Sequence, residues 1–268
     1  MKIIKPNAIE LKQTDLFKHI ELCGRTCYKS EDRITDDSAE KFVNMLRSHA
    51  HGAILEHGTV YLKIGPAYTL LESDLVDYFA NNPYSKVITH SFSDTSEWLI
   101  TTNYRVITEM PHIYKNMWKK YICEPTEYHA KRRTFKITCN RGVSHEFVRH
   151  RVFSFAQESQ RYCNYSKDKF GKEIKVIEPN VLSFNSCDDM SSYLVWTRSC
   201  EDAEKAYFWL LENGAKPQEA RDVLPNAIAT ELIMTGFESD WEHFFNLRCA
   251  KDAHPQAQEV ANIIKEQF

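Results

Sequence analysis

The chain has 268 residues, a formal net charge of -3, and 43% hydrophobic against 26% charged residues. This length can bury the core of one large domain, and the composition indicates neither a disordered protein nor a membrane protein. The net negative charge argues against a surface built broadly to hold nucleic acid, so affinity for phosphate must come from local arginine clusters. Because no apolar run has the length of a membrane span or a signal peptide, we expect a cytoplasmic protein.

The first expected elements are a helix and a strand. Residues 36–50 have an acidic start and apolar side chains at helical spacing, and Gly52 follows as a stop. Residues 58–64 alternate apolar and polar side chains, and residues 134–139 repeat the pattern, so we expect two strands that could pair with each other. Between them, residues 65–130 contain several prolines and helix-like stretches near 68–80 and 111–122, which we interpret as an insertion.

The remaining elements are expected to be helical. Asn213-Gly214 is typical of a helix C-terminal stop, Pro225 and Pro255 suit first helical turns, and Ser239 to Glu242 has the spacing of a capping box. The expected helices cover residues 142–156, 189–213, 225–232, 239–248 and a last segment from residue 255.

Eight cysteines are present, but the chain has no Cys-x-x-Cys pair and no compact disulfide framework. We therefore expect reduced thiols. Cys23 and Cys27 could share a helix face, yet no neighbouring His/Cys cluster supplies the further ligands of a zinc site. We interpret them as packing residues and predict no metal site.

The stretch Arg149–Tyr162 (RHRVFSFAQESQRY) concentrates arginines, a histidine and serines beside apolar residues. Arginine offers a rigid fork of donors that suits phosphate and is always charged, so such a cluster needs anionic partners. In a helix, Arg149 and Arg151 would point to roughly opposite sides, which implies two ligands or a ligand and a protein carboxylate. The alternative is that these arginines pair with Glu146 and Glu158 on a solvated helix, and spacing alone does not decide between the two.

These residues resemble a known signature. Arg149-His150-Arg151, followed after seven residues by Ser159 and then by Arg161-Tyr162, resembles the motif of the flavin-dependent thymidylate synthases. Three more segments resemble that family in the right order: Glu56-His57 with Thr59, Arg221 to Pro225 with Thr230, and Phe245 to Arg248 with His254. Singly, each has a bland explanation: His57 as a surface histidine, Arg221 as a helix cap and Arg248 as a complement to a helix dipole.

The resemblance implies an α/β (α+β) fold with a mostly antiparallel sheet flanked by helices. Residues 1–268 would form a single catalytic domain with a family-atypical insertion at about 65–130. The resemblance also implies a homotetramer whose sites lie at subunit interfaces.

The implied activity is the reductive methylation of dUMP to dTMP by a methyltransferase. 5,10-Methylenetetrahydrofolate would give the carbon, and NADPH would reduce the FAD that supplies the hydride chemistry. The family uses no enzyme thiolate on the pyrimidine, so no cysteine needs to be catalytic.

The resemblance also assigns residues. Arg248 is the candidate catalytic group, because a guanidinium beside N3 and O2 would stabilise an anionic uracil ring. The implied dUMP contacts are Glu146, Phe147, Val148, Arg149, Gln157, Glu158, Ser159, Gln160, Arg161, Arg221 and Arg248. The implied FAD contacts are His57, Thr59, Arg149, His150, Arg151, Val152, Gln157, Phe237, Glu238, Ser239 and His243. Gln157, Gln160 and His243 depart from the family pattern, which leaves their side-chain contacts open.

Two other classes compete with this interpretation. A nucleic-acid-binding module could use Lys131-Arg132-Arg133 together with Arg149-His150-Arg151, although the net negative charge and the lack of an interleaved aromatic signature disfavour it. A flavoprotein oxidoreductase without methyl transfer would also account for a flavin site. A yellow preparation would exclude the first, and flavin reoxidation that depends on dUMP would exclude the second.

Overall fold

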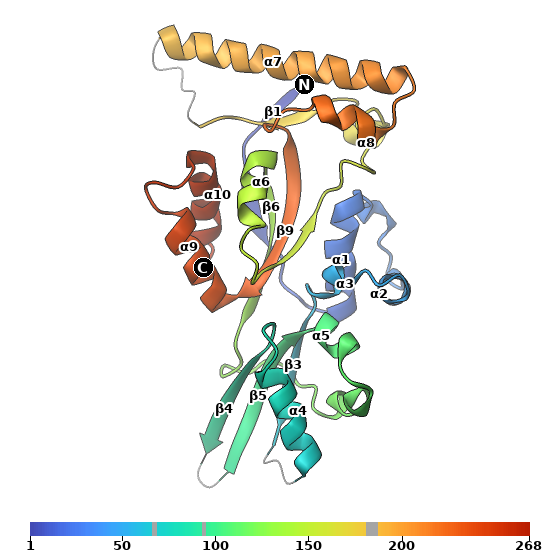
Figure 1. The fold of residues 1–268 in the computed structure, drawn as a ribbon, viewed down its shortest axis with the longest axis vertical. Coiled ribbons are helices and arrows are strands. Elements are labelled where there is room, and N and C mark those ends of the chain that lie inside the picture. Colours follow the sequence, from blue (N-terminus) through green and yellow to red (C-terminus); the bar gives the residue numbers. More distant parts are fainter. Residues whose placement is uncertain (66–68, 93–94, 181–186) are drawn as a thin grey trace.

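The computed structural model describes residues 1–65, 69–92, 95–180 and 187–268. The molecule is elongated, with a long helix across one end, a four-stranded sheet in the middle and a three-stranded sheet at the other end (Figure 1). Every strand pair except β1–β8 is antiparallel, which confirms the expected mixed fold with mostly antiparallel sheets. Within the described ranges, no helix is both long and apolar enough to span a membrane.

The central sheet has the strand order β2-β6-β9-β7. Its strands are β2 (Asn7–Glu10), β6 (Arg132–Asn140), β9 (Ala229–Phe237) and β7 (Ser154–Gln157). Successive side chains of β6 point to opposite faces, so Phe135 and Ile137 share one face with Leu232 of β9.

Helices cover both faces of this sheet. The first face packs against α6 (Arg141–Phe147), α9 (Glu238–Arg248) and α10 (Pro255–Lys265), whose Phe147, Trp241 and Phe244 are fully buried. The opposite face packs against α1 (Leu16–Tyr28), where Cys23 meets Ile233 of β9. The expected packing role of Cys23 is confirmed, because the side chain belongs to this core.

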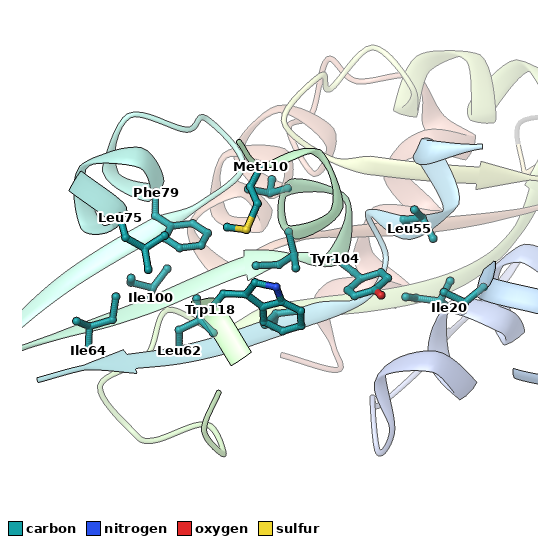
Figure 2. Close-up of a cluster of buried hydrophobic side chains, with 14 of the residues drawn as sticks. Ile20, Leu55, Leu62, Ile64, Leu75, Phe79, Ile100, Tyr104, Met110 and Trp118 are labelled. Carbon is teal, nitrogen blue, oxygen red and sulfur yellow. The ribbon is translucent and has the colours of Figure 1, made fainter. Parts of the chain in front are cut away.

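The three-stranded sheet contains much of the segment interpreted as an insertion. Its order is β3-β5-β4, with β3 (Thr59–Ile64), β5 (Thr95–Asn103) and β4 (Lys86–Phe92). It packs with α2 (Ser38–Ser48), α3 (Gly52–Leu55), α4 (Leu70–Ala80) and α5 (Tyr104–Glu109) around one apolar core that includes Leu62, Ile100 and Trp118 (Figure 2). The suggested pairing of residues 58–64 with 134–139 is wrong: the strand bonds to β5, which the insertion supplies, whereas β6 bonds to β2 and β9.

The other end of the molecule holds a third core. The strands β1 (Lys2–Ile4) and β8 (Lys175–Ile177) pair in parallel beneath α7 (Cys187–Glu212) and α8 (Pro217–Ala220). Gly214 follows α7 with φ +93°, a conformation that favours glycine, so the predicted C-terminal stop is confirmed.

Three helix predictions fail in whole or in part, and the one over 142–156 is confirmed only as far as Phe147. After α6 ends at Phe147, the chain turns and enters β7, because Ala156 faces the core beneath α1 and the segment bonds to β9. Pro225 begins a turn instead of a helix, and β9 follows it. Residues 111–122 form no α-helix but two short 3-10 helices, His112–Tyr114 and Trp118–Lys120.

The helix expected from residue 239 begins one residue earlier. The backbone N–H of Phe237 donates to Asp240 Oδ2 (3.1 Å), so Phe237, not Ser239, is the capping residue. The helices predicted over 36–50, near 68–80 and from residue 255 are confirmed.

A buried chain of hydrogen bonds crosses the junction between the two larger sheets. It runs from His19 Nε2 to Thr134 Oγ1 (3.2 Å), on to Thr235 Oγ1 (2.8 Å) and then to His57 Nδ1 (2.8 Å). All four side chains are buried. Burial lowers the pKa of His19 to about 4 and that of His57 to about 3, with Arg132 adding to both shifts. Both imidazoles are therefore neutral in the folded protein near pH 7.

Acidification should destabilise the fold through these histidines. Between about pH 6.5 and pH 4 the unfolded chain binds protons that the folded chain does not, so the free energy of unfolding must fall as pH falls. Denaturant titrations from pH 7 to pH 4 should show this fall, and His19→Gln should reduce the slope by about one proton. The matched control His112→Gln, at an exposed position, should retain the wild-type slope. Equal slopes in all three proteins would contradict this account.

A tight contact between β9 and Phe153 gives a second test. A Cβ atom at Gly236 would lie 2.4 Å from the Phe153 ring, which cannot move freely because it is buried. Gly236→Ala should lower the free energy of unfolding by about 1–3 kcal/mol. Gly65→Ala, where no described atom lies within 4 Å of the added carbon, is the control and should change it by less than about 0.5 kcal/mol. Similar losses in both variants would refute the contact.

Candidate functional site

The Arg149-His150-Arg151 motif lies in a turn after α6 rather than in a helix. Arg149 and Arg151 are exposed, whereas His150 is buried and packs edge-on against Phe244. Burial, together with the nearby charges of Arg248 and His243, lowers the pKa of His150 to about 4. A neutral His150 can accept a hydrogen bond, and both flanking arginines are accessible to a ligand.

Arg248 joins this turn to the end of α9. Its Nε donates to His150 Nε2 (2.9 Å), its Nη1 to Glu146 Oε2 (2.5 Å) and its Nη2 to the Glu146 carbonyl oxygen (2.9 Å). The competing interpretation paired Glu146 with an arginine of the motif. In the structure, Glu146 pairs with Arg248 instead. These contacts fix the plane of the guanidinium, which still has Nη hydrogens to offer a ligand.

A second group forms where the chain leaves β7. The Glu158 N–H donates to the Glu231 carbonyl (2.8 Å) and the Ser159 N–H to the Cys27 carbonyl (2.9 Å), so sheet and α1 together set the start of this loop. Gln160 is buried, and its side-chain nitrogen has no hydrogen-bond partner among the described residues. An unpaired buried amide is costly, so this nitrogen is a ready donor for a ligand.

Glu158 sits in a charged setting that the sequence motif did not reveal. The Lys29 Nζ lies 2.5 Å from Glu231 Oε2 and 3.8 Å from Glu158 Oε2, and the Tyr165 hydroxyl donates to Glu158 (3.1 Å). Burial and the neighbouring Glu231 raise the pKa of Glu158, although Lys29 opposes the shift. These side chains line a cavity of about 480 Å³, which also includes Thr230.

Two more arginines belong near this cavity. Arg221 is half-buried, and its Nε lies 3.9 Å from Asp222 Oδ1. Burial lowers the pKa of Arg141, and the nearby charge of Arg221 lowers it as well. Gln157 donates to the hydroxyls of Ser144 (2.8 Å) and Thr230 (3.3 Å). Sequence reasoning missed Lys29 and Arg141, because each depends on neighbours that are distant along the chain.

A third group lies at the junction of the two larger sheets. The Thr59 hydroxyl accepts from Arg132 Nη1 (3.1 Å), and the sheet register places Arg132 opposite Phe237. Lys86 of β4 lies 4.6 Å from the centre of the Phe237 ring and donates to the Ser239 hydroxyl. Here the segment interpreted as an insertion supplies a cation beside residues that the resemblance assigns to FAD.

The predicted residues therefore differ in exposure. Those that are exposed are Val148, Arg149, Arg151, Val152, Arg161, Ser239 and His243. Those that are half-buried are Glu146, Gln157, Ser159, Arg221, Glu238 and Arg248. Those that are buried are His57, Thr59, Phe147, His150, Glu158, Gln160 and Phe237. Across the described ranges, no hydrogen bond or ion pair connects the group around Arg248 with the group around Glu158.

The thiols near these groups are poor nucleophiles. Burial raises the pKa of Cys27 to about 11 and that of Cys163 to about 12, and it raises that of Cys23 further. Protonated thiols do not attack an electrophile at neutral pH. Among the residues that the structure describes, no group of three or more His, Cys, Asp or Glu side chains could hold a metal ion.

Comparison with known proteins identifies relatives for part of the chain. The chain is 33% identical over 126 residues to a flavin-dependent thymidylate synthase of Geobacter sulfurreducens, and the match covers 46% of this chain and 49% of the relative. It is 32% identical over 129 residues to one of Pyrococcus abyssi, covering 48% and 50%. The chain thus spans about half the length of the curated relatives it matches. A solved structure of the UMP/dUMP methylase PolB from Streptomyces cacaoi is similar with a TM-score of 0.47 and 17% identity, covering 100% of this chain and 91% of that one.

A sequence model of one family covers more of the chain than any of these pairwise matches. That family is described as thymidylate synthase complementing protein, and the match extends over residues 85–268. The matched range includes the Arg149-His150-Arg151 motif, the loop from Glu158 to Arg161, Arg221 and Arg248. The chain therefore belongs to the thymidylate synthase complementing protein family.

Proposed function

We propose that the chain is a flavin-dependent thymidylate synthase that converts dUMP to dTMP, with 5,10-methylenetetrahydrofolate as carbon donor and NADPH as reductant of FAD. Family membership supports this activity, and so do the names of the relatives. The observation that carries the proposal is the fixed guanidinium of Arg248, held by Glu146 and a neutral His150.

In this proposal Arg248 acts on the pyrimidine. A guanidinium beside O2 and N3 of uracil would stabilise negative charge that develops on the ring when C5 becomes nucleophilic. Glu146 and His150 would hold the fork in its plane, so that little reorganisation is needed during the reaction. Because a guanidinium stays charged, Arg248 would act by electrostatics and not by taking a proton.

The group around Glu158 would hold the phosphate and sugar of dUMP. Arg161 and Arg221 offer guanidinium forks, Ser159 a hydroxyl and Gln160 its unpaired amide nitrogen. Arg141 would add positive charge beside Arg221. Phe147 lies in the core and Val148 on the surface, so they would position the turn and border the ligand respectively.

FAD would meet two surfaces of the protein. Arg149, His150, Arg151 and Val152 form the exposed motif turn, and Thr59, Phe237, Glu238 and Ser239 lie at the sheet junction with His57 buried behind them. The positive charge of Arg132, whose direct partners are neutral oxygens, suits the phosphate-bearing part of FAD, which when bound supplies the hydride for reduction. His243 and Gln157 are further contacts in this proposal.

We further infer that the site is assembled from several subunits of a homotetramer. The groups around Arg248 and Glu158 have no direct polar link across the described ranges of one chain, and the arginines at 149, 151 and 161 are exposed. Neighbouring copies could bring such exposed arginines to one nucleotide.

The flavin gives the most direct test of the activity. The purified protein should show the absorption of bound FAD, and NADPH should bleach it. Reoxidation without oxygen should then require both dUMP and methylenetetrahydrofolate and should yield dTMP. A bleached flavin that never responds to dUMP would instead indicate an oxidoreductase without methyl transfer.

Arg248→Lys tests the proposed catalytic residue. A point charge cannot reproduce the planar fork, so kcat should fall about 10²–10³-fold. FAD content and the thermal unfolding midpoint should stay close to those of the wild type. Arg198→Lys, at an exposed position on α7, is the matched control and should retain full turnover. Near-normal turnover in Arg248→Lys would refute the role.

A further inference from the structure

Arg132 carries a charge that no described carboxylate neutralises by direct contact. Its Nη1 donates to the Thr59 hydroxyl (3.1 Å) and its Nη2 to the Glu56 carbonyl oxygen (3.0 Å), both of which are neutral acceptors. The next residue, Arg133, shows the usual solution, because its Nε and Nη2 bind both carboxylate oxygens of Glu10 at 2.7 and 2.8 Å. Of these two adjacent arginines on one strand, Arg133 therefore binds a carboxylate directly and Arg132 does not.

Burial makes the charge of Arg132 costly. It lowers the pKa of the guanidinium to about 10, and the carboxylates of Glu56 and Asp240 offset this only in part. The same charge helps to keep His19 and His57 neutral. Arg132 is half-buried, and a guanidinium withdrawn from water without an anion is unfavourable, so a bound anion would stabilise the junction.

A second cation lies against the same aromatic ring. The Lys86 Nζ is 4.6 Å and the Arg132 Cζ is 5.6 Å from the centre of the Phe237 ring. Lys86 donates to the Ser239 hydroxyl, and none of the ion pairs among the described residues includes its amine. Two positive groups that share one ring repel each other unless an anion lies between or beside them.

The surroundings supply donors and space. The hydroxyls of Thr59 and Ser239 accept bonds from the two cations, so their own protons are free to point to an anion. On the side of Arg132, a cavity of about 490 Å³ borders Thr59, Tyr61, Arg132 and Thr134, while Lys86 and Ser239 lie outside its lining. That volume suits part of a nucleotide.

We propose that Arg132 and Lys86, with the hydroxyls of Thr59 and Ser239, form an anion site that holds a phosphate group of a nucleotide cofactor. The identity of that cofactor as FAD rests on the proposed function, and NADPH carries the same chemistry. The site gives the segment at 65–130 a role, since β4 brings Lys86 to the junction. The two cations come from different sheets, so the bound phosphate would also hold the sheets together.

The test compares Arg132→Gln, Lys86→Gln and the control Lys131→Gln, which removes an exposed charge next to Arg132. Each protein is stripped of flavin, and the Kd values for FAD and NADPH are measured by fluorescence titration. Thermal unfolding with and without inorganic pyrophosphate provides a readout that needs no flavin. Lys86→Gln changes a residue at the sheet edge, so it tests the site even if Arg132→Gln fails to fold.

In the wild type and in Lys131→Gln, pyrophosphate should raise the midpoint of unfolding, and this rise should disappear in Arg132→Gln and Lys86→Gln. The Kd for one nucleotide should rise about tenfold or more in both variants, because each loses a charged hydrogen bond. A higher Kd for FAD in both variants identifies FAD as the occupant of the site. A higher Kd for NADPH alone identifies NADPH.

The inference is overturned if folded Lys86→Gln and Arg132→Gln bind FAD, NADPH and pyrophosphate as tightly as the wild type. Its failure is distinguishable from failure of the proposed function. A wild type that binds pyrophosphate through these residues but gives no dTMP would refute only the function. A wild type that makes dTMP with variants of unchanged affinity would refute only the site.

Discussion

The contact between Arg248 and the turn after α6 is the interaction on which the proposed chemistry depends. It joins the C-terminal end of α9 to Glu146 and His150, and these positions meet only because Trp241 and Phe244 anchor α9 on the central sheet. A guanidinium held on two edges keeps its orientation, and orientation is what electrostatic stabilisation of a developing charge requires. The core of the central sheet therefore positions the side chain of Arg248.

The three-stranded sheet adds a second polar region to the molecule, at its junction with the central sheet. The segment at 65–130 supplies β4 and β5; β5 pairs with β3 and β4 with β5, and the segment shares one apolar core with β3. The junction between the sheets gathers neutral histidines and threonine hydroxyls around a charged Arg132. A polar junction is a weak choice for stability alone and a suitable one for binding an anion.

The sequence predicted most helices because their apolar spacing and end signals are local, as in the helices near 36–50 and from residue 255. It failed where a strand is too short to show its period, as in the four-residue β7, and where an alternating pattern does not say which strand is the partner, as for β3. The motif residues were found by resemblance to a family. Lys29, Arg132 and Lys86 could not be, because only the fold shows which charges lie beside them.

A structure of the assembled protein with FAD and dUMP tests the central claim most directly, because that claim concerns convergence. The account predicts that the guanidinium of Arg248 lies beside the uracil ring, with Arg161 and Arg221 on the phosphate of the same nucleotide, whichever subunits contribute them. A complex in which these guanidiniums contact different molecules, or none, would contradict it.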